Sequence, residues 1–126
     1  MKRALVLSAI VLTLGLPAFT QNDRLPEPSQ RSDTPYRVFR TKNIYTLLKL
    51  DTRTGQVWQV QWGEANDRGT IAIEAKPIFE AGKQAGRFTL EPTENIFTFI
   101  LLDQETGRTW QVQWGDDKHR FIVAIE

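Results

Sequence analysis

The sequence predicts an all-β fold: two tandem copies of a roughly four-stranded antiparallel unit, packed as a pseudo-symmetric sandwich or barrel. Two observations support this prediction. Residues 41–74 align with residues 93–126 without a gap, and 18 of the 34 positions are identical. Each copy also contains four short runs of β-branched, aromatic and other apolar residues with turn signals between them. A repeat of this length is typical of a duplicated supersecondary unit.

The apolar runs predict where the strands lie. In the first copy they cover residues 36–40, 43–50, 56–63 and 70–74, and in the second 87–91, 95–102, 108–114 and 120–125. The segment between the copies, residues 75–87, is expected to be a loop with room for one helical turn, because Gly82 and Gly86 limit its helicity. The predicted domain therefore spans residues 36–126, with repeat 1 at 36–74 and repeat 2 at 87–126.

A tight hairpin is predicted in each copy, at LDTRTGQ (50–56) and at LDQETGR (102–108). Asp51 and Asp103 can accept backbone hydrogen bonds at the start of the turn, and Gly55 and Gly107 can supply the positive φ that closes it. A four-residue loop would place Leu47 opposite Val60 and Lys49 opposite Trp58. A three-residue loop would exchange the partners on one strand.

With the four-residue loop, strand alternation places the aromatic residues of each copy on one face of its sheet. We expect the two aromatic faces to pack against each other about a pseudo-two-fold axis, because a single four-stranded sheet is marginal alone. Trp58, Trp62, Trp110 and Trp114 would then dominate the core. The two faces are Tyr45, Leu47, Lys49, Trp58, Val60 and Trp62 in the first copy, and Phe97, Phe99, Leu101, Trp110, Val112 and Trp114 in the second.

The opposite faces would turn outward and carry a possible ligand face of Gln59, Gln61, Gln111 and Gln113. Glutamine side chains donate and accept hydrogen bonds, which suits an uncharged polymer or a peptide strand. The alternatives are a solvated sheet surface without a ligand, or exposed tryptophans that stack on sugar rings.

The first 20 residues have the pattern of a signal peptide, with Lys2 and Arg3 before an apolar run at 4–16 and Pro17 after it. Cleavage is expected after Thr20 or after Ala18. An N-terminal anchor or a buried helix is the alternative, although the run is short for a membrane span. A periplasmic or secreted protein is therefore predicted, without a stable membrane anchor after cleavage.

Residues 21–35 are rich in proline, charge and small polar side chains, which predicts a flexible linker. A tail that orders on a partner is the alternative. Removal of Lys2 and Arg3 would leave 14 basic and 15 acidic residues, which are interspersed along the chain. Nucleic acid binding therefore has no electrostatic basis. The chain has no cysteine, which excludes a disulfide framework and a lipoprotein anchor.

Candidate catalytic and metal-binding residues are few. His119 is the only histidine and lies in a predicted turn, which favours a solvated side chain. Asp51 and Asp103 could form a pair of acids for glycoside hydrolysis, but their turn role explains them more simply. We therefore predict no catalytic residue, no cofactor and no specific metal site. The loop residues that could offer oxygen ligands to Ca²⁺ are Glu64, Asn66, Asp67, Asp116 and Asp117.

The motif seen as KLDTRTGQVWQV and LLDQETGRTWQV resembles that of small exported β-repeat proteins of Bacteroides-like bacteria, whose function is unknown. The resemblance covers nearly all of residues 36–126 and implies a small exported β-domain. The turn also resembles the last hairpin of WD-type propeller blades. Two units cannot close a propeller and the Gly-His signature is missing, so we interpret this likeness as shared turn chemistry.

These observations favour an exported, non-enzymatic β-repeat domain that binds a protein or glycan partner. The alternatives are a small hydrolase that acts on envelope polymers, which the thin catalytic inventory disfavours, and a purely structural module of the cell envelope.

Overall fold

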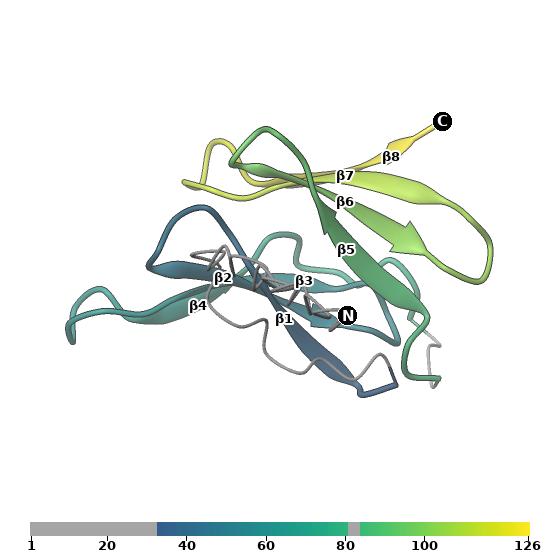
Figure 1. Ribbon diagram of the computed structural model, residues 1–126, viewed down its shortest axis with the longest axis horizontal. Coiled ribbons are helices and arrows are strands. Elements are labelled where there is room, and N and C mark those ends of the chain that lie inside the picture. Colours follow the sequence, from purple (N-terminus) through teal and green to yellow (C-terminus); the bar gives the residue numbers. More distant parts are fainter. Residues whose placement is uncertain (1–32, 81–83) are drawn as a thin grey trace, which may run out of the picture.

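A computed structural model describes residues 33–80 and 84–126 of the chain. The predicted signal peptide and residues 21–32 of the predicted linker lie outside the described residues. Two four-stranded antiparallel sheets form the domain, in the orders β1-β2-β3-β4 and β5-β6-β7-β8, and they pack as two layers of a sandwich (Figure 1). The all-β, two-unit prediction is confirmed. The strands are β1 (Tyr36–Arg40), β2 (Thr46–Asp51), β3 (Val57–Gln61), β4 (Gly69–Ala72), β5 (Phe88–Pro92), β6 (Thr98–Asp103), β7 (Thr109–Gln113) and β8 (Phe121–Ile125).

No helix of membrane-spanning length and hydropathy occurs within residues 33–80 and 84–126.

The predicted hairpin turn is present in both sheets. The carboxylate of Asp51 accepts a hydrogen bond from the backbone N–H of Arg53 at 2.9 Å, and Asp103 does the same for Glu105 at 3.0 Å. Gly55 and Gly107 adopt φ values of 77° and 78°, which L-residues rarely adopt. Leu47 pairs with Val60 and Lys49 with Trp58, so the loop has four residues, as expected.

The two sheets bury opposite faces, which the sequence analysis did not anticipate. The second sheet turns its aromatic face inward, where Phe99, Trp110, Val112 and Trp114 are buried. The first sheet turns its other face inward and contributes Leu48, Leu50 and Val57 to the same core. The expected contact between two aromatic faces is therefore wrong, and so is the pseudo-two-fold relation that would bring like faces together.

Only two of the four tryptophans belong to the core. Trp110 and Trp114 are 7% and 4% exposed, whereas Trp62 is 51% exposed and Trp58 is half-buried. The predicted core role of Trp62 is therefore wrong, and Trp58 lies on the same outer face. The physical reason is that both sheets carry the same pair of faces. The aromatic face of the second sheet packs against the other, mixed face of the first sheet. The aromatic face of the first sheet therefore stays outside.

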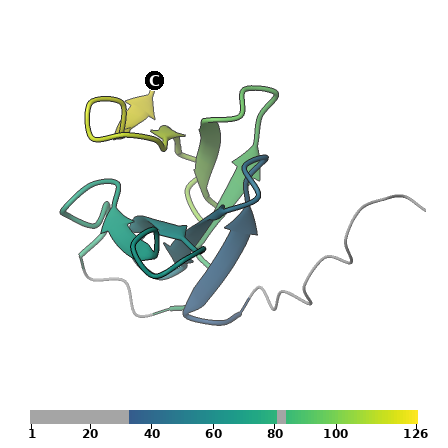
Figure 2. The same ribbon diagram turned by 90° about the vertical axis from the view of Figure 1, so that its left-hand side faces the viewer.

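The edge strands β1 and β5 explain this arrangement. Arg37 donates to the hydroxyl of Thr89 at 3.2 Å, and Lys42 donates to the backbone oxygen of Glu94 at 3.2 Å. Both pairs join residues 52 positions apart: Arg37 and Thr89 are equivalent positions of β1 and β5, and Lys42 and Glu94 are equivalent positions in the loops that follow these strands. The two strands run in the same direction (Figure 1), and Figure 2 shows the layers from the side.

Candidate functional site

The outer surface of the first sheet is the candidate site, and no described part of the chain covers it. We call it the open aromatic face. Its largest side chains stand well out of the protein: Tyr36, Tyr45 and Trp62 are 52%, 48% and 51% exposed. An exposed apolar surface of this kind is typical of an interaction site. The face consists of Tyr36, Val38, Tyr45, Leu47, Lys49, Trp58, Val60 and Trp62.

The rings of the open aromatic face are arranged like the rings of the buried one. Tyr36 and Trp58 have centroids 6.4 Å apart, and Tyr45 and Trp62 have centroids 5.3 Å apart, both with planes tilted by 56°. The equivalent pairs of the second sheet, Phe88 with Trp110 and Phe97 with Trp114, lie at 6.2 and 4.9 Å with the same tilt, and of these four rings all but Phe97 are buried. The open face thus holds its side chains in the geometry of a face that is already covered.

Polar groups distinguish the open aromatic face from its buried counterpart. The ammonium of Lys49 lies 4.7 Å from the ring centre of Trp58, and the guanidinium of Arg53 lies 5.2 Å from that of Tyr36. Arg53 also donates to the hydroxyl of Tyr36 at 3.1 Å. Each cation–π contact is worth about 0.5–1 kcal/mol at an exposed site. These groups let the face meet water while its rings stay available to a partner.

The four glutamines do not form one outer ligand face, and that expectation is wrong. The side-chain oxygen of Gln59 accepts a hydrogen bond from the backbone N–H of Gly115 at 3.0 Å, so Gln59 lies between the sheets. Gln61 is exposed at the end of the same inward-turned face. Gln111 and Gln113 do lie outside, on what we call the open glutamine face. It consists of Thr98, Ile100, Leu102, Thr109, Gln111, Gln113, Val123 and Ile125.

Two equivalent pockets lie at the sheet ends that follow β3 and β7. The first has a volume of about 450 Å³ and the second of about 290 Å³. Each combines aromatic side chains with a loop that carries carboxylates. The linings occupy matching positions: Tyr45, Gln61, Trp62, Gly63, Glu64 and Asp67 in the first, and Phe97, Gln113, Trp114, Gly115, Asp116 and His119 in the second.

Neither loop brings together a metal-binding cluster. Glu64 and Asp67 line one pocket and Asp116 lines the other, while Asn66 and Asp117 line neither. No group of three histidine, cysteine or acidic residues is close enough to hold a metal ion in the described ranges 33–80 and 84–126.

His119 is paired with Asp116 in its turn. Its Nδ1 lies 2.6 Å from a carboxylate oxygen of Asp116, and both side chains are about two-thirds exposed. The hydrogen bond with His119 holds the pKa of the Asp116 carboxyl below its usual value. This is a solvated pair within a turn, as expected for the histidine from its position in the sequence.

Asp51 and Asp103 are held by their own turns in different sheets. Asp51 receives the guanidinium of Arg53 at 3.0 Å, and Asp103 receives that of Arg87 at 2.9 Å. Burial alone would raise the pKa of Asp103, but hydrogen bonds from Arg87, Thr106 and two backbone N–H groups outweigh it and lower the pKa to about 2. Each carboxylate is therefore engaged locally, and the two do not face a common substrate position.

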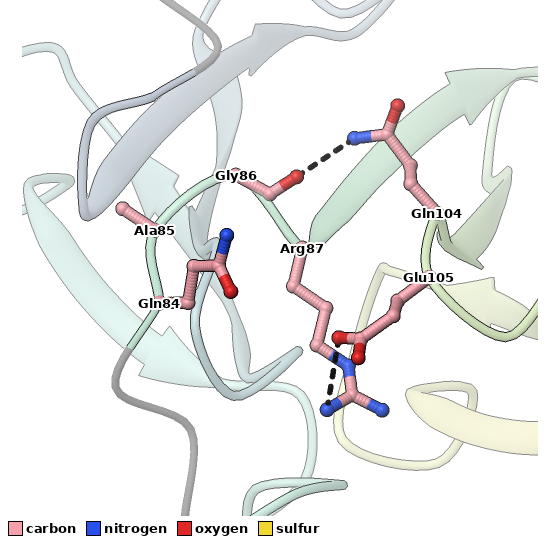
Figure 3. A pocket seen from close by; sticks show the side chains of 6 residues that line it. All are labelled: Gln84, Ala85, Gly86, Arg87, Gln104 and Glu105. Carbon is pink, nitrogen blue, oxygen red and sulfur yellow. Dashed lines mark hydrogen bonds and ion pairs between the residues drawn. The ribbon is translucent and has the colours of Figure 1, made fainter.

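A third pocket, of about 400 Å³, lies beside the second turn (Figure 3). In that view the guanidinium of Arg87 points toward the carboxylate of Glu105, 3.5 Å away, and the amide of Gln104 donates to the oxygen of Gly86 at 3.0 Å. Arg87 also binds Asp103, so its charge is already balanced within the protein. Among the six described residues that line this pocket, Arg87 is the only cation, and its charge is engaged by Asp103 and Glu105.

The chain matches no protein-family model, no curated protein and no solved structure. The resemblance to small exported β-repeat proteins therefore stays a prediction, and the site is argued from its geometry.

The sequence analysis missed the role of β1 and the exposure of the first aromatic face. A signal for both exists in the differences between the copies. Tyr36, Tyr45 and Lys49 replace Phe88, Phe97 and Leu101 of the second copy. Each change adds a hydroxyl or an ammonium group to the aromatic face of the first copy, where burial would be costly without a partner.

Proposed function

We propose that this protein is an exported, non-enzymatic β-repeat domain that binds a protein partner through its open aromatic face. The observation that carries the proposal is the pair of tilted, half-exposed ring contacts, Tyr36 with Trp58 and Tyr45 with Trp62. Tryptophan and tyrosine dominate the binding energy of protein interfaces, because they bury a large area and keep a polar group for the rim. The export part of the proposal rests on the pattern of residues 1–20.

A protein partner fits this face better than a small ligand. The exposed rings and aliphatic side chains extend over β1, β2 and β3 as one sheet surface, from Tyr36 to Trp62. Lys49 and Arg53 supply positive charge beside the rings, as at the polar rim of an interface. A glycan that stacks on the indoles is the competing outcome, and the same variants test it.

The test compares Trp62→Ala with Phe79→Ala. Phe79 is also exposed, but it belongs to the segment that connects the two sheets and its ring lies against Arg87, on neither open face, so it controls for the loss of any exposed aromatic ring. Wild type and both variants are tested against a native envelope extract and a glycan array, after circular dichroism confirms that they fold. We expect Trp62→Ala to weaken binding to a protein partner at least ~10-fold, and Phe79→Ala to leave it unchanged. Equal binding by both variants would contradict the proposal, and Trp62-dependent binding to glycans alone would replace the protein partner.

A further inference from the structure

The two open faces of the molecule are the counterparts of the two faces that already meet inside it. On the aromatic side, Trp114 is 4% exposed and its equivalent, Trp62, is 51% exposed. On the other side, Ile73 is 6% exposed and its equivalent, Ile125, is 49% exposed. The duplication therefore leaves one complementary surface unpaired at each end of the two-sheet stack.

We propose that copies of this chain assemble head to tail, so that the open glutamine face of one copy covers the open aromatic face of the next. The contact would repeat the interface between the first and second sheets. This inference rests on the proposed function and identifies its partner as a second copy of the chain. An interface between unlike faces is heterologous, and it either closes into a ring or extends as a filament.

A hydrogen bond that joins the two sheets inside the molecule has an equivalent pair of residues on the open faces. Gln59 accepts a hydrogen bond from the N–H of Gly115, and the equivalent residues Gln111 and Gly63 would pair in the same way between copies. Both are available for this: Gln111 lies on the open glutamine face, and Gly63 lies at the end of the first sheet beside Trp62.

The turn glycines make a second matched pair. A Cβ on Gly55 would lie 3.1 Å from the ring of Phe88, so this turn packs directly on the second sheet. At the equivalent Gly107, no described atom lies within 4 Å of such a Cβ. Between copies, Gly107 would approach Tyr36, which stands 52% exposed in the position equivalent to Phe88.

Charge is also complementary in the loops that follow the edge strands β1 and β5. Lys42 reaches the backbone of Glu94 across the internal interface, at 3.2 Å. In the contact between copies the roles reverse, and Glu94 of one copy would face Lys42 of the next. The repeat therefore places opposite charges at equivalent positions, which favours the contact between copies.

The placement of β1 and β5 favours a closed ring over a filament. One pair of equivalent residues in these strands, and one pair in the loops that follow them, contact each other without a shift along the strand. If each new sheet is placed on the previous one in the same way, it is rotated about an axis along these strands and is not shifted along that axis. Four-stranded sheets arranged in this way form a propeller, which typically closes with four to eight sheets. At two sheets per copy, closure requires two, three or four copies.

The experiment combines native mass spectrometry and sedimentation velocity on wild-type protein with one charge variant for each face. Val60→Glu alters the open aromatic face beside Lys49, and Ile100→Lys alters the open glutamine face opposite Glu91, so each new charge has a partner in the free sheet. The equivalents of these positions, Val112 and Leu48, are fully buried. Circular dichroism confirms that both variants fold.

We expect wild type to form one closed species of two to four copies. Each variant alone should weaken self-association at least ~100-fold, because the contact would take its new charge out of water. A mixture of the two variants should form a 1:1 heterodimer, since each supplies the face that the other lacks. Wild-type protein that stays monomeric, or a mixture that fails to pair, would overturn the inference. Filaments would keep the head-to-tail contact and overturn the closed ring. If wild type is monomeric and Trp62-dependent binding to another protein persists, the proposed function survives and only its partner changes.

Discussion

At the residue scale, Asp103 shows how a single carboxylate stabilises the second turn. It is 2% exposed and receives the guanidinium of Arg87 through two hydrogen bonds, at 3.1 and 2.9 Å. The hydroxyl of Thr106 adds a third bond at 2.8 Å. Ionisation of this buried group is favourable only because these donors surround it.

The lowered pKa of Asp103 predicts a pH dependence of stability. The value falls from 3.8 to about 2 in the folded protein, so the ionised group contributes about 2 kcal/mol to the free energy of unfolding above about pH 5. This contribution is lost as the pH falls through about 2. Asp103→Asn should therefore cost about 2 kcal/mol at neutral pH and much less near pH 2, as measured by urea unfolding at both values. A loss that did not change with pH would show that the carboxylate charge is not what holds the turn.

At the element scale, the two hairpin turns have the same backbone but different surroundings. Gly55 and Gly107 have almost equal φ values, yet only Gly55 packs on a ring. Phe88, the ring that it touches, is 1% exposed and has no room to move. The turn of the first copy is therefore part of the contact between the sheets.

Alanine substitutions at the two glycines separate these effects. Gly107→Ala should cost about 1 kcal/mol from backbone strain alone. Gly55→Ala carries the same strain and a contact of 3.1 Å with the Phe88 ring, so it should cost clearly more. Thermal unfolding of both variants, in the Ile100→Lys background that we expect to be monomeric, measures the difference. Equal losses would mean that the first turn does not pack on the second sheet.

The strands, turns and register were predictable because they depend on local chemistry. The alternation around Trp58 and the Asp51–Gly55 turn specify a hairpin with a four-residue loop, as the pairing of Lys49 with Trp58 confirms. The choice of face was not predictable from alternation, because each copy offers the same two faces. Tyr36 and Tyr45 carry hydroxyls and Lys49 carries an ammonium group, where the second copy has Phe88, Phe97 and Leu101. This difference in polarity indicates which aromatic face stays exposed, but only a comparison of the two copies, position by position, reveals it.

At the scale of the whole molecule, one feature organises the protein: two similar sheets meet through unlike faces. The buried aromatic face of the second sheet is covered by aliphatic side chains of the first, such as Leu48, Leu50 and Val57. The aromatic face of the first sheet stays exposed, and this exposure is the feature of the fold that supports the proposed binding function.

The most direct test of this account compares the free energy of unfolding lost on Trp114→Ala and on Trp62→Ala, two equivalent positions, in the Ile100→Lys background that we expect to be monomeric. Trp114 is buried and its indole N–H donates to the oxygen of Ile96 at 3.0 Å. Trp114→Ala should therefore cost about 3–5 kcal/mol, whereas Trp62→Ala, on the open face, should cost less than about 1 kcal/mol. Equal losses at the two positions would mean that like faces meet after all, and would contradict the account.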